Sequence, residues 1–562
     1  MRNLLLTIAA AALAVGPVSA KRPVVAPDLR FDTAGETDLI IVHDDDDDDN
    51  SAENRRSRLD KLGARGQERM RGVRMSRMKA NRRVVDDLTK DPKIRYIAPD
   101  RKVSASGSGS IDLMENRALI GLPVNNVGTY TGAGIGVAVV DSGIYEGPAF
   151  RGGYRCAQSR VVYRESFVPG SSYTGDQYGH GTHVASLLSS NAACDSRDPV
   201  NGVAPGVSIV NLRVLDRNGV GTDSAVIAAI DRAIQLRGAY NIRVINLSLG
   251  RQVRESFVYD PLCQAVERAW QAGITVVVAA GNLGRDTSMG TYGYSTIASP
   301  ANDPFVITVG AARDASAPSS RNDDTIASYS SKGPSLLDRV VKPDLVAPGN
   351  RMVARILFST TLANSFPNNQ ESIGSDTSFF RLSGTSMAAP VVSGAAALLL
   401  QKDRTMTPDQ VKARLMKTAW KGMPGTASIH DSLTRQTFQV QHDVFTIGAG
   451  YLDVGAALAT SEKIGSSQSA RSPRVAMQSG RAVITNSYPD MSSSNVVWGT
   501  NVVWGTNVVW GANVIQSNNI VWGSNIVWGT SSMAGYNVVW GNNVVWGAMS
   551  LFPMSLTGNG DN

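Results

Sequence analysis

A serine among small residues is the first candidate for chemistry in this sequence. Ser386 lies in the segment Ser-Gly-Thr-Ser-Met-Ala-Ala-Pro, directly before an apolar run that predicts a buried helix. A hydroxyl at a helix N-terminus lies beside free backbone N–H groups and the positive end of the helix dipole, which can hold a developing anion. Serine is also a common helix cap, so Ser386 alone leaves a structural role equally open.

Three other segments supply the partners that a nucleophilic serine needs. Asp141 ends an apolar run, His180 lies between two glycines, and Asn282 ends a second apolar run. Each has a structural alternative, because aspartate and asparagine cap turns; His183, three residues after His180, is interpreted as structural. A serine hydroxyl needs a base, and the base needs a partner that fixes its tautomer. Asp141, His180 and Ser386 fit these roles, and the Asn282 amide with the Ser386 N–H can bind an oxyanion.

Alternating apolar runs and helical patterns predict the elements that position these residues. The predicted strands cover residues 135–140, 208–215, 244–249, 274–279 and 306–311, and the predicted helices cover residues 180–188, 223–236, 261–272, 386–400 and 408–418. Continuous apolar strands separated by helices indicate an α/β fold with a parallel sheet covered on both faces. Ligands bind such sheets at the carboxyl ends of the strands, where Asp141 and Asn282 fall.

Taken in order, these motifs resemble those of the subtilisin-like serine peptidases, the subtilases. The matching segments are D-S-G-I from Asp141, G-H-G-T-H-V-A around His180, A-A-G-N ending at Asn282 and S-G-T-S-M-A-A-P around Ser386. The order Asp, His, Ser is that of subtilisin, and the resemblance covers about residues 111–462. It implies a subtilisin-like three-layer fold with a central parallel sheet, and a serine endopeptidase that hydrolyses polypeptides.

The resemblance also implies where a substrate binds. Ser248, Leu249 and Gly250 match the strand that pairs with the substrate backbone. Ala279, Ala280 and Gly281 match the opposite wall of the first specificity pocket. Neither segment contains an acidic residue, so we expect cleavage after large apolar residues rather than a strict preference for Lys or Arg.

No cofactor is required by this interpretation, and no metal ligand is assigned. The family allows a structural calcium ion, but residues 191–201 replace the region that often forms its calcium loop. That segment has Asp195 and Asp198 beside Arg197, which leaves a calcium site there unsupported. The chain has three cysteines; Cys156 with Cys194 is the favoured disulfide, although spacing alone does not settle the pairing.

The N-terminal part of the chain indicates export and maturation. Residues 1–20 contain Arg2, a short apolar run and small residues before a cleavage point after Ala20, which predicts a signal peptide and a secreted protein, extracellular or at the cell surface. A membrane anchor is the weaker alternative, because the run is too short to span a bilayer. Residues 21–103 resemble the family's inhibitory propeptide, so the chain is expected to be a zymogen that cleaves itself between about Asp100 and Ser110.

The remaining regions are a peptidase domain at residues 104–464, a linker at 465–494, repeats of Asn-Val-Val-Trp-Gly at 495–548 and a C-terminal end at 549–562. On a strand, equivalent residues of a hexad repeat face the same way. The repeats therefore predict a β-solenoid, self-association or binding to a surface, with a disordered or trimmed tail as the alternative. In a rival interpretation the chain is an adhesive, self-assembling protein with a passive peptidase fold, but the complete set of four site residues argues against it.

Charge excludes one further class of function. The formal net charge of +7 belongs to a chain whose acidic and basic runs lie together within residues 1–103. A nucleic-acid-binding protein needs a basic patch on its working domain, and the sequence after residue 103 has none. No segment after the signal peptide is long and apolar enough to predict a transmembrane helix.

Overall fold

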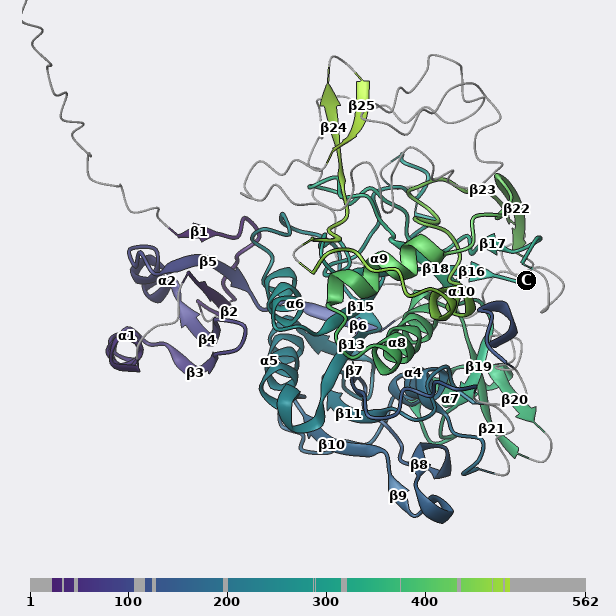
Figure 1. The fold of residues 1–562 in the computed structure, drawn as a ribbon. Coiled ribbons are helices and arrows are strands. Elements are labelled where there is room, and N and C mark those ends of the chain that lie inside the picture. The colour runs from purple at the N-terminus through teal and green to yellow at the C-terminus, as the bar shows by residue number, and fades with distance from the viewer. Residues whose placement is uncertain are drawn as a thin grey trace, which may run out of the picture. The chain divides into compact units, whose positions relative to one another are not determined.

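The computed structural model describes residues 23–32, 35–44, 49–105, 117–123, 128–195, 201–286, 288, 290–314, 321–373, 376–431, 436–466, 468–478 and 481–485 (Figure 1). The predicted signal peptide at 1–20 and the predicted repeats at 495–548 lie outside the described residues. Internal contacts divide the chain into two compact units, one of residues 1–69 and 74–99 and the other of residues 70–73 and 100–562. Within the described part of the chain, no helix has the length and apolar character needed to cross a membrane.

The first unit is a small sheet with two helices. Its strand order is β1-β5-β2-β4-β3, with β1 parallel to β5 and β2 antiparallel to both of its neighbours. The strands are β1 (Val24–Val25), β2 (Glu36–His43), β3 (Arg65–Met70), β4 (Met75–Asn81) and β5 (Ile94–Pro99), and the helices are α1 (Asp49–Lys61) and α2 (Arg82–Leu88). From β2 to β5 the chain follows the βαββαβ order of a split βαβ unit.

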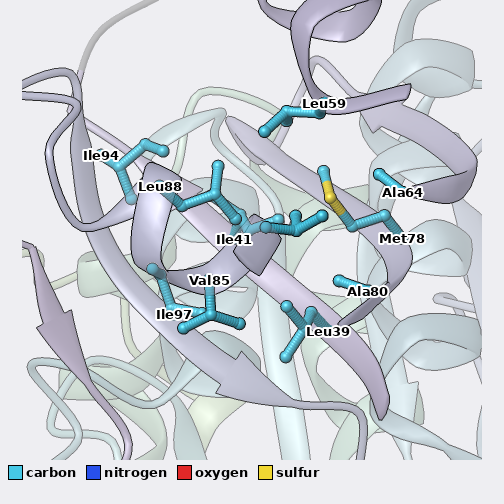
Figure 2. Packing of buried hydrophobic residues seen from close by; sticks show 11 residues of the cluster. Leu39, Ile41, Leu59, Ala64, Met78, Ala80, Val85, Leu88, Ile94 and Ile97 are labelled. Atoms are coloured by element: carbon cyan, nitrogen blue, oxygen red, sulfur yellow. The ribbon is translucent and has the colours of Figure 1, made fainter. Parts of the chain in front are cut away.

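An apolar core holds the first unit together. Leu39 and Ile41 lie two residues apart on β2, so their side chains share one face of the sheet. They form one buried cluster with Leu59 of α1 and with Val85 and Leu88 of α2 (Figure 2). Complete burial of such side chains stabilises the fold by about 1.5–3 kcal/mol each.

The second unit is built on a parallel sheet of seven strands. The order of the strands is β10-β11-β7-β13-β15-β16. β18 pairs with β16 in parallel, and the short β17 (Thr325–Ile326) pairs with β16 in antiparallel orientation. The parallel strands are β7 (Gly136–Asp141), β10 (Val161–Ser166), β11 (Ser208–Arg213), β13 (Ile242–Leu247), β15 (Thr275–Ala279), β16 (Ile307–Arg313) and β18 (Leu345–Pro348). From β7 the chain passes to the edge strand β10, returns to β11 beside β7 and then continues at β13 on the other side of β7. The strand order therefore reverses between β7 and β13, which is where ligands bind such sheets.

Helices cover both faces of this sheet, which confirms the predicted α/β architecture. One face carries α5 (Asp223–Tyr240) and α6 (Pro261–Gln271), and the other carries α4 (His180–Ser189) and α8 (Thr385–Lys402) (Figure 1). Every residue of α8 from Thr385 to Leu400 is buried, as its small and apolar side chains require. Two further helices, α9 (Pro408–Thr418) and α10 (Val454–Ala459), pack on each other.

Smaller elements surround this core. In a three-stranded sheet, β6 (Lys102–Ala105) lies between β12 (Val220–Thr222) and β14 (Leu249–Gly250) and runs antiparallel to both. The others are β8 (Arg151–Gly152), β9 (Gln158–Ser159), β19 (Met352–Arg355), α7 (Thr361–Ser365), β20 (Gln370–Ile373), β21 (Asp376–Leu382), β22 (Thr426–Asp431), β23 (Gln436–Gln441), β24 (Arg474–Gln478) and β25 (Arg481–Thr485). Cys156 and Cys194 form the favoured disulfide, and Cys263 is a buried thiol.

Candidate active site

The carboxyl end of β7 brings Asp141 to the N-terminus of α4. Oδ1 of Asp141 lies 2.8 Å from Nδ1 of His180, and both side chains are almost fully buried. Gly179 before the helix has φ 107°, and a Cβ there would lie 2.8 Å from the hydroxyl oxygen of Thr360. Glycine is therefore required for this entry into the helix. Because a carboxylate only accepts, Nδ1 of His180 donates, and the tautomer that results leaves Nε2 available as a base.

A second aspartate joins these two elements, and sequence reasoning missed it. Oδ1 of Asp176 accepts hydrogen bonds from the Gly179 N–H (2.7 Å) and from the hydroxyl of Ser142 (2.9 Å), which follows Asp141. Oδ2 accepts from the Thr182 N–H at 2.8 Å. Burial raises the pKa of Asp176, and the hydrogen bonds from Thr182, Gly179 and Ser142 oppose that rise. An acidic residue four positions before a helix-opening histidine is a signal for such a cap.

His183 lies on the same helix as His180 but has different partners. Its Nε2 lies 3.1 Å from the carbonyl oxygen of Met352 and 3.0 Å from that of Phe380. Burial lowers the pKa of His183 to about 3, so the ring is neutral in the folded protein. These contacts with fixed carbonyls agree with the structural role expected from the sequence.

Ser386 is the second residue of α8, and its backbone has an unusual partner. Pro390 has no N–H, so the Ser386 carbonyl, four residues earlier, has no helical donor. The hydroxyl of Ser248 donates to that carbonyl at 2.8 Å, and the Ser386 hydroxyl donates to the carbonyl of Ser248 at 3.0 Å. The amide of Asn246 donates to the Ser248 hydroxyl at 3.0 Å. Ser248, directly after β13, therefore holds both the backbone and the side chain of Ser386.

Asn282 follows β15, and Thr385 orients its amide. Oδ1 of Asn282 lies 3.0 Å from both the backbone N and the hydroxyl oxygen of Thr385. The same hydroxyl accepts a hydrogen bond from the Gly281 N–H at 3.0 Å. With Oδ1 committed to two donors, Nδ2 is the end of the amide directed away from Thr385. Sequence reasoning also missed Thr385, although it directly precedes Ser386 in the matching motif.

The two segments expected to bind a substrate differ in their backbones. Leu249 and Gly250 form β14, whose edge pairs with β6 through Leu249–Ala105 and Gly250–Ser104. The opposite segment begins at Ala279, the last residue of β15, and the N–H and C=O groups of Ala280 and Gly281 form hydrogen bonds within the protein. The first segment can thus accept an extended chain, whereas the second contributes a wall of small residues.

The loop considered for calcium has a different cation beside its buried aspartate. Oδ2 of Asp195 lies 3.0 Å from Nη2 of Arg355, and the carboxylate is buried. The guanidinium group therefore balances this charge, while Asp198 lies outside the described residues. Among the described residues of this loop, the structure does not bring together the several oxygen ligands that calcium prefers.

An acidic cluster elsewhere is a better candidate for an ion. Asp314, Asp323 and Asp324 have carboxylate oxygens that all lie within 4.8 Å of one another. Asp324 is fully buried, and burial, followed by the neighbouring carboxylates of Asp314 and Asp323, raises its pKa to about 8. Repulsion among carboxylates at this spacing would be relieved by a cation, so this cluster could bind an ion.

Four elements thus converge on one edge of the sheet, bringing Asp141 from β7, His180 from α4, Ser386 from α8 and Asn282 from the end of β15. A carboxylate, an imidazole and a hydroxyl can together carry out nucleophilic attack on an acyl carbon. An amide donor and a helix N-terminus beside them can bind the oxyanion that this attack produces.

Several known proteins are similar to this chain in sequence. Residues 132–450 match the model of the subtilase family. The chain is 39% identical over 302 residues to "Serine protease AprX" of Bacillus subtilis (strain 168), a match that covers 52% of this chain and 62% of that protein. It is 38% identical over 290 residues to "Subtilisin DY" of Bacillus licheniformis, covering 52% of this chain and 85% of that protein.

Two further similarities concern a relative and a solved structure. The "Extracellular serine proteinase" of Thermus sp. (strain Rt41A) is 36% identical over 341 residues, which cover 58% of this chain and 67% of that protein. The crystal structure of fervidolysin from Fervidobacterium pennivorans, described as a keratinolytic enzyme related to subtilisin, superimposes with a TM-score of 0.57 at 20% identity. That match covers 78% of this chain and 63% of fervidolysin, and it shows a common fold.

Proposed function

Because this chain belongs to the subtilase family of serine peptidases, we propose that it is an endopeptidase that uses Asp141, His180 and Ser386 as its catalytic triad. The observation that carries this proposal is the 2.8 Å contact between Asp141 and Nδ1 of His180, at the sheet edge where α8 begins with Thr385 and Ser386. In this mechanism Asp141 keeps the imidazole in the tautomer that has a basic Nε2. His183, the other histidine of α4, does not fit this role, because its Nε2 bonds to backbone carbonyls.

The reaction proceeds by acyl transfer. Oγ of Ser386 attacks the peptide carbonyl carbon while its proton passes to Nε2 of His180. The tetrahedral oxyanion is bound by the Asn282 amide and the Ser386 backbone N–H. When the peptide C–N bond breaks, His180 returns the proton to the leaving amine and an acyl-enzyme remains. Water, deprotonated by His180, then releases the second product and restores Ser386.

Substrates bind as an added strand. The edge of β14, Leu249 and Gly250, already pairs with β6, which supports binding of an extended polypeptide through its main chain. Ser248 lies at the start of that edge, and the wall opposite consists of Ala279, Ala280 and Gly281. Small residues on that wall leave room for a large apolar side chain in the first specificity pocket.

The chain also cleaves itself during maturation. β6 is antiparallel to β14, with Ser104 opposite Gly250 and Ala105 opposite Leu249, so the described part of β6 runs toward Ser248. Because the Ser248 carbonyl accepts from the Ser386 hydroxyl, we expect cleavage within the two residues that follow Ala105. This lies inside the span from Asp100 to Ser110 expected from the sequence, and cleavage there would release residues 21–103, the proposed inhibitory propeptide, with the few residues that follow them.

Other parts of the proposal concern location, ions and the tail. The chain is secreted after removal of residues 1–20; the Thermus relative is named an extracellular proteinase. Calcium is the structural ion that we expect at Asp314, Asp323 and Asp324, because three carboxylates suit a hard cation. The repeats at 495–548 mediate self-association or binding to a surface, and polypeptides are the substrates.

A single comparison tests the proposed activity. Wild type and Ser386→Ala are expressed with the complete sequence, and casein hydrolysis and the mass of the secreted product are measured. Wild type should hydrolyse casein and begin within a few residues of Gly107, whereas Ser386→Ala should be inactive and retain residues 21–103. Equal processing and equal hydrolysis by the two proteins would sink the proposal.

A further inference from the structure

A buried acidic cluster in the second unit, Asp223, Glu255 and Asp260 around Arg251, binds Arg101, which precedes β6. The side chain of Arg101 is 9% exposed and that of Glu255 is 4% exposed. Nη2 of Arg101 lies 2.8 Å from Oε2 of Glu255, and Nη1 donates to Oε1. Two parallel N–H···O bonds from a planar guanidinium to a carboxylate form a geometry that lysine and neutral side chains cannot reproduce.

The side chains around Glu255 keep a net negative charge in this cluster when Arg101 is absent. Nε of Arg251 lies 2.9 Å from both carboxylate oxygens of Asp223, and its Nη2 lies 2.8 Å from Asp260. Arg251 is 3.9 Å from Glu255, so these side chains form one buried group. This group contains three carboxylates and two guanidinium groups, so removal of Arg101 leaves more negative than positive charge among these five side chains.

A second contact recognises the residue before Arg101. The N–H of Ser224, at the start of α5, donates to Oδ1 of Asp100 at 2.7 Å, and the Ser224 hydroxyl donates to Oδ2. The N–H of Asp223 donates to the carbonyl of Arg101 at 2.6 Å. A carboxylate at the N-terminus of this 18-residue helix is stabilised by free N–H groups and by the helix dipole. An acidic residue followed by arginine thus meets two complementary features.

The pairing of β6 indicates where this acidic cluster lies in sequence relative to the proposed cleaved bond. β6 pairs with β12 and β14, and Arg101 directly precedes it. If the bond after position 106 is cleaved, Arg101 is the sixth residue before it. The residues of the acidic cluster belong to the part of the chain that is retained after the proposed cleavage, whereas Asp100 and Arg101 belong to the part that is released.

We propose that Glu255, together with the N-terminus of α5, is a remote specificity site that selects polypeptides with an acidic residue and an arginine at the seventh and sixth positions before the cleaved bond. The chain's own Asp100 and Arg101 are its first occupants, and extended substrates with the same pair follow them after maturation. This inference rests on the proposed peptidase function and names a substrate class for it. Glu255 acts on substrate binding and has no part in the bond-breaking steps.

The test uses three quenched fluorescent peptides and the mature enzyme. The long peptide has the sequence of residues 100–110, the second has the change Arg101→Gln, and the short peptide has residues 102–110 only. Wild type should cleave the long peptide with a kcat/KM at least about tenfold above that of the Arg101→Gln peptide, through KM, because a buried charge pair is lost. Glu255→Gln should cleave those two peptides equally.

The short peptide and a control variant separate the possible outcomes. The short peptide does not reach Glu255, so it should be cleaved equally by wild type and Glu255→Gln and reports the folded, active fraction of each. Glu146→Gln, which changes an exposed partner of Arg164, should retain the preference of wild type. An equal kcat/KM for the first two peptides in wild type, or a preference that persists in Glu255→Gln, would overturn the inference. Failure of wild type to cleave even the short peptide would overturn the proposed function instead.

Should Glu255→Gln yield no active fraction, wild type alone decides. The preference for the long peptide over its Arg101→Gln counterpart should decrease as the salt concentration rises, since it depends on charge. A preference that is absent at low salt would contradict the remote site.

Discussion

Two buried aspartates of the second unit have partners of opposite kinds. Asp141 bonds to His180, a group that can take up and release a proton near neutral pH. Asp344 bonds instead to two ammonium groups, with Oδ2 2.8 Å from Nζ of Lys342 and Oδ1 3.0 Å from Nζ of Lys412. All of these side chains are almost fully buried. Burial and polarity therefore do not distinguish the proposed catalytic cluster from the cluster around Asp344.

The cluster around Asp344 is attached to backbone. Nζ of Lys412 also donates to the carbonyl oxygens of Pro304 (3.0 Å) and Val306 (2.9 Å). Burial would raise the pKa of Asp344, but the two ammonium groups hold it below its usual value. Burial lowers the pKa of Lys412 to about 7, and Asp344 opposes that effect. The carboxylate of Asp344 balances the two ammonium groups beside it, whereas Asp141 bonds to an imidazole that can exchange a proton. The two clusters therefore differ in the chemistry of the group that is bound to the aspartate.

The same substitution at the two aspartates should have opposite effects on activity and stability. The largest effect is expected for Asp141→Asn, on kcat. Asparagine cannot hold the same tautomer of His180, so kcat should fall by about 10⁴-fold, the loss known when a triad aspartate becomes asparagine. Stability should change little, because the volume is kept. The measurement is peptide hydrolysis by protein matured in trans with a trace of wild type, beside urea unfolding. A kcat within tenfold of wild type would exclude the role of Asp141.

The second substitution, Asp344→Asn, should reverse that pattern. It removes the carboxylate that bonds to the buried ammonium groups of both Lys342 and Lys412, so the free energy of unfolding should fall by about 3–5 kcal/mol. The kcat per titrated active site should remain that of wild type, because no substrate contact changes. Urea denaturation and active-site titration measure the two quantities. A large loss of kcat at unchanged stability would show that the cluster is not structural.

A pH series sharpens the comparison between histidines with different partners. Nε2 of His442 accepts from the Ile326 N–H at 3.0 Å, and burial lowers the pKa of His442 to about 4. The ring is thus neutral in the folded protein but is protonated in the unfolded chain below about pH 6.5. Stability should therefore fall as the pH drops from about 6.5 toward 4, by about 2 kcal/mol at pH 5 for this residue.

His183, with a pKa near 3, contributes in the same direction. Unfolding by urea at pH 8 and pH 5 tests the expectation, with His442→Gln as the variant that should lose one share of the pH dependence. A His442→Gln protein with the same difference between the two pH values as wild type would contradict this assignment.

The smallest effect is expected at Thr385, which orients a donor without contacting the reaction. Thr385→Val removes the hydroxyl that donates to Asn282 and accepts from Gly281. We expect kcat to fall by about tenfold with KM unchanged, less than the 10²–10³ known for the loss of subtilisin's own oxyanion-hole asparagine. Steady-state kinetics on the short peptide measure it. An unchanged kcat would show that the amide of Asn282 holds its orientation without Thr385.

The comparison also shows how much of the molecule could be predicted from the sequence. The sheet, its covering helices and the residues Asp141, His180, Asn282 and Ser386 follow from local patterns, namely apolar runs and glycine-flanked polar residues. Such patterns reveal the ends of elements, and in a parallel sheet the carboxyl ends lie at one edge.

The supporting contacts could not be predicted, because they join residues far apart in the chain. Ser248 and Ser386, which exchange two hydrogen bonds, are 138 positions apart, and Arg101 and Glu255 are 154 apart. The vacancy that Pro390 leaves at the Ser386 carbonyl is readable from the sequence, but the donor that fills it is not. The loop in which the sequence leaves a calcium site unsupported has an ion pair between Asp195 and Arg355. The acidic cluster was not predicted, because the local sequence does not show that the chain brings Asp314 back beside Asp323 and Asp324.

Covalent labelling is the most direct test of the central claim that Ser386 is the nucleophile activated by His180. Mature enzyme is treated with a fluorophosphonate, and the modified residue is located by peptide mass spectrometry. We predict one label per molecule, on Ser386, with labelling abolished in Ser386→Ala and strongly slowed in His180→Ala. A fully active enzyme that is labelled at another residue, or that is not labelled at all, would contradict the account.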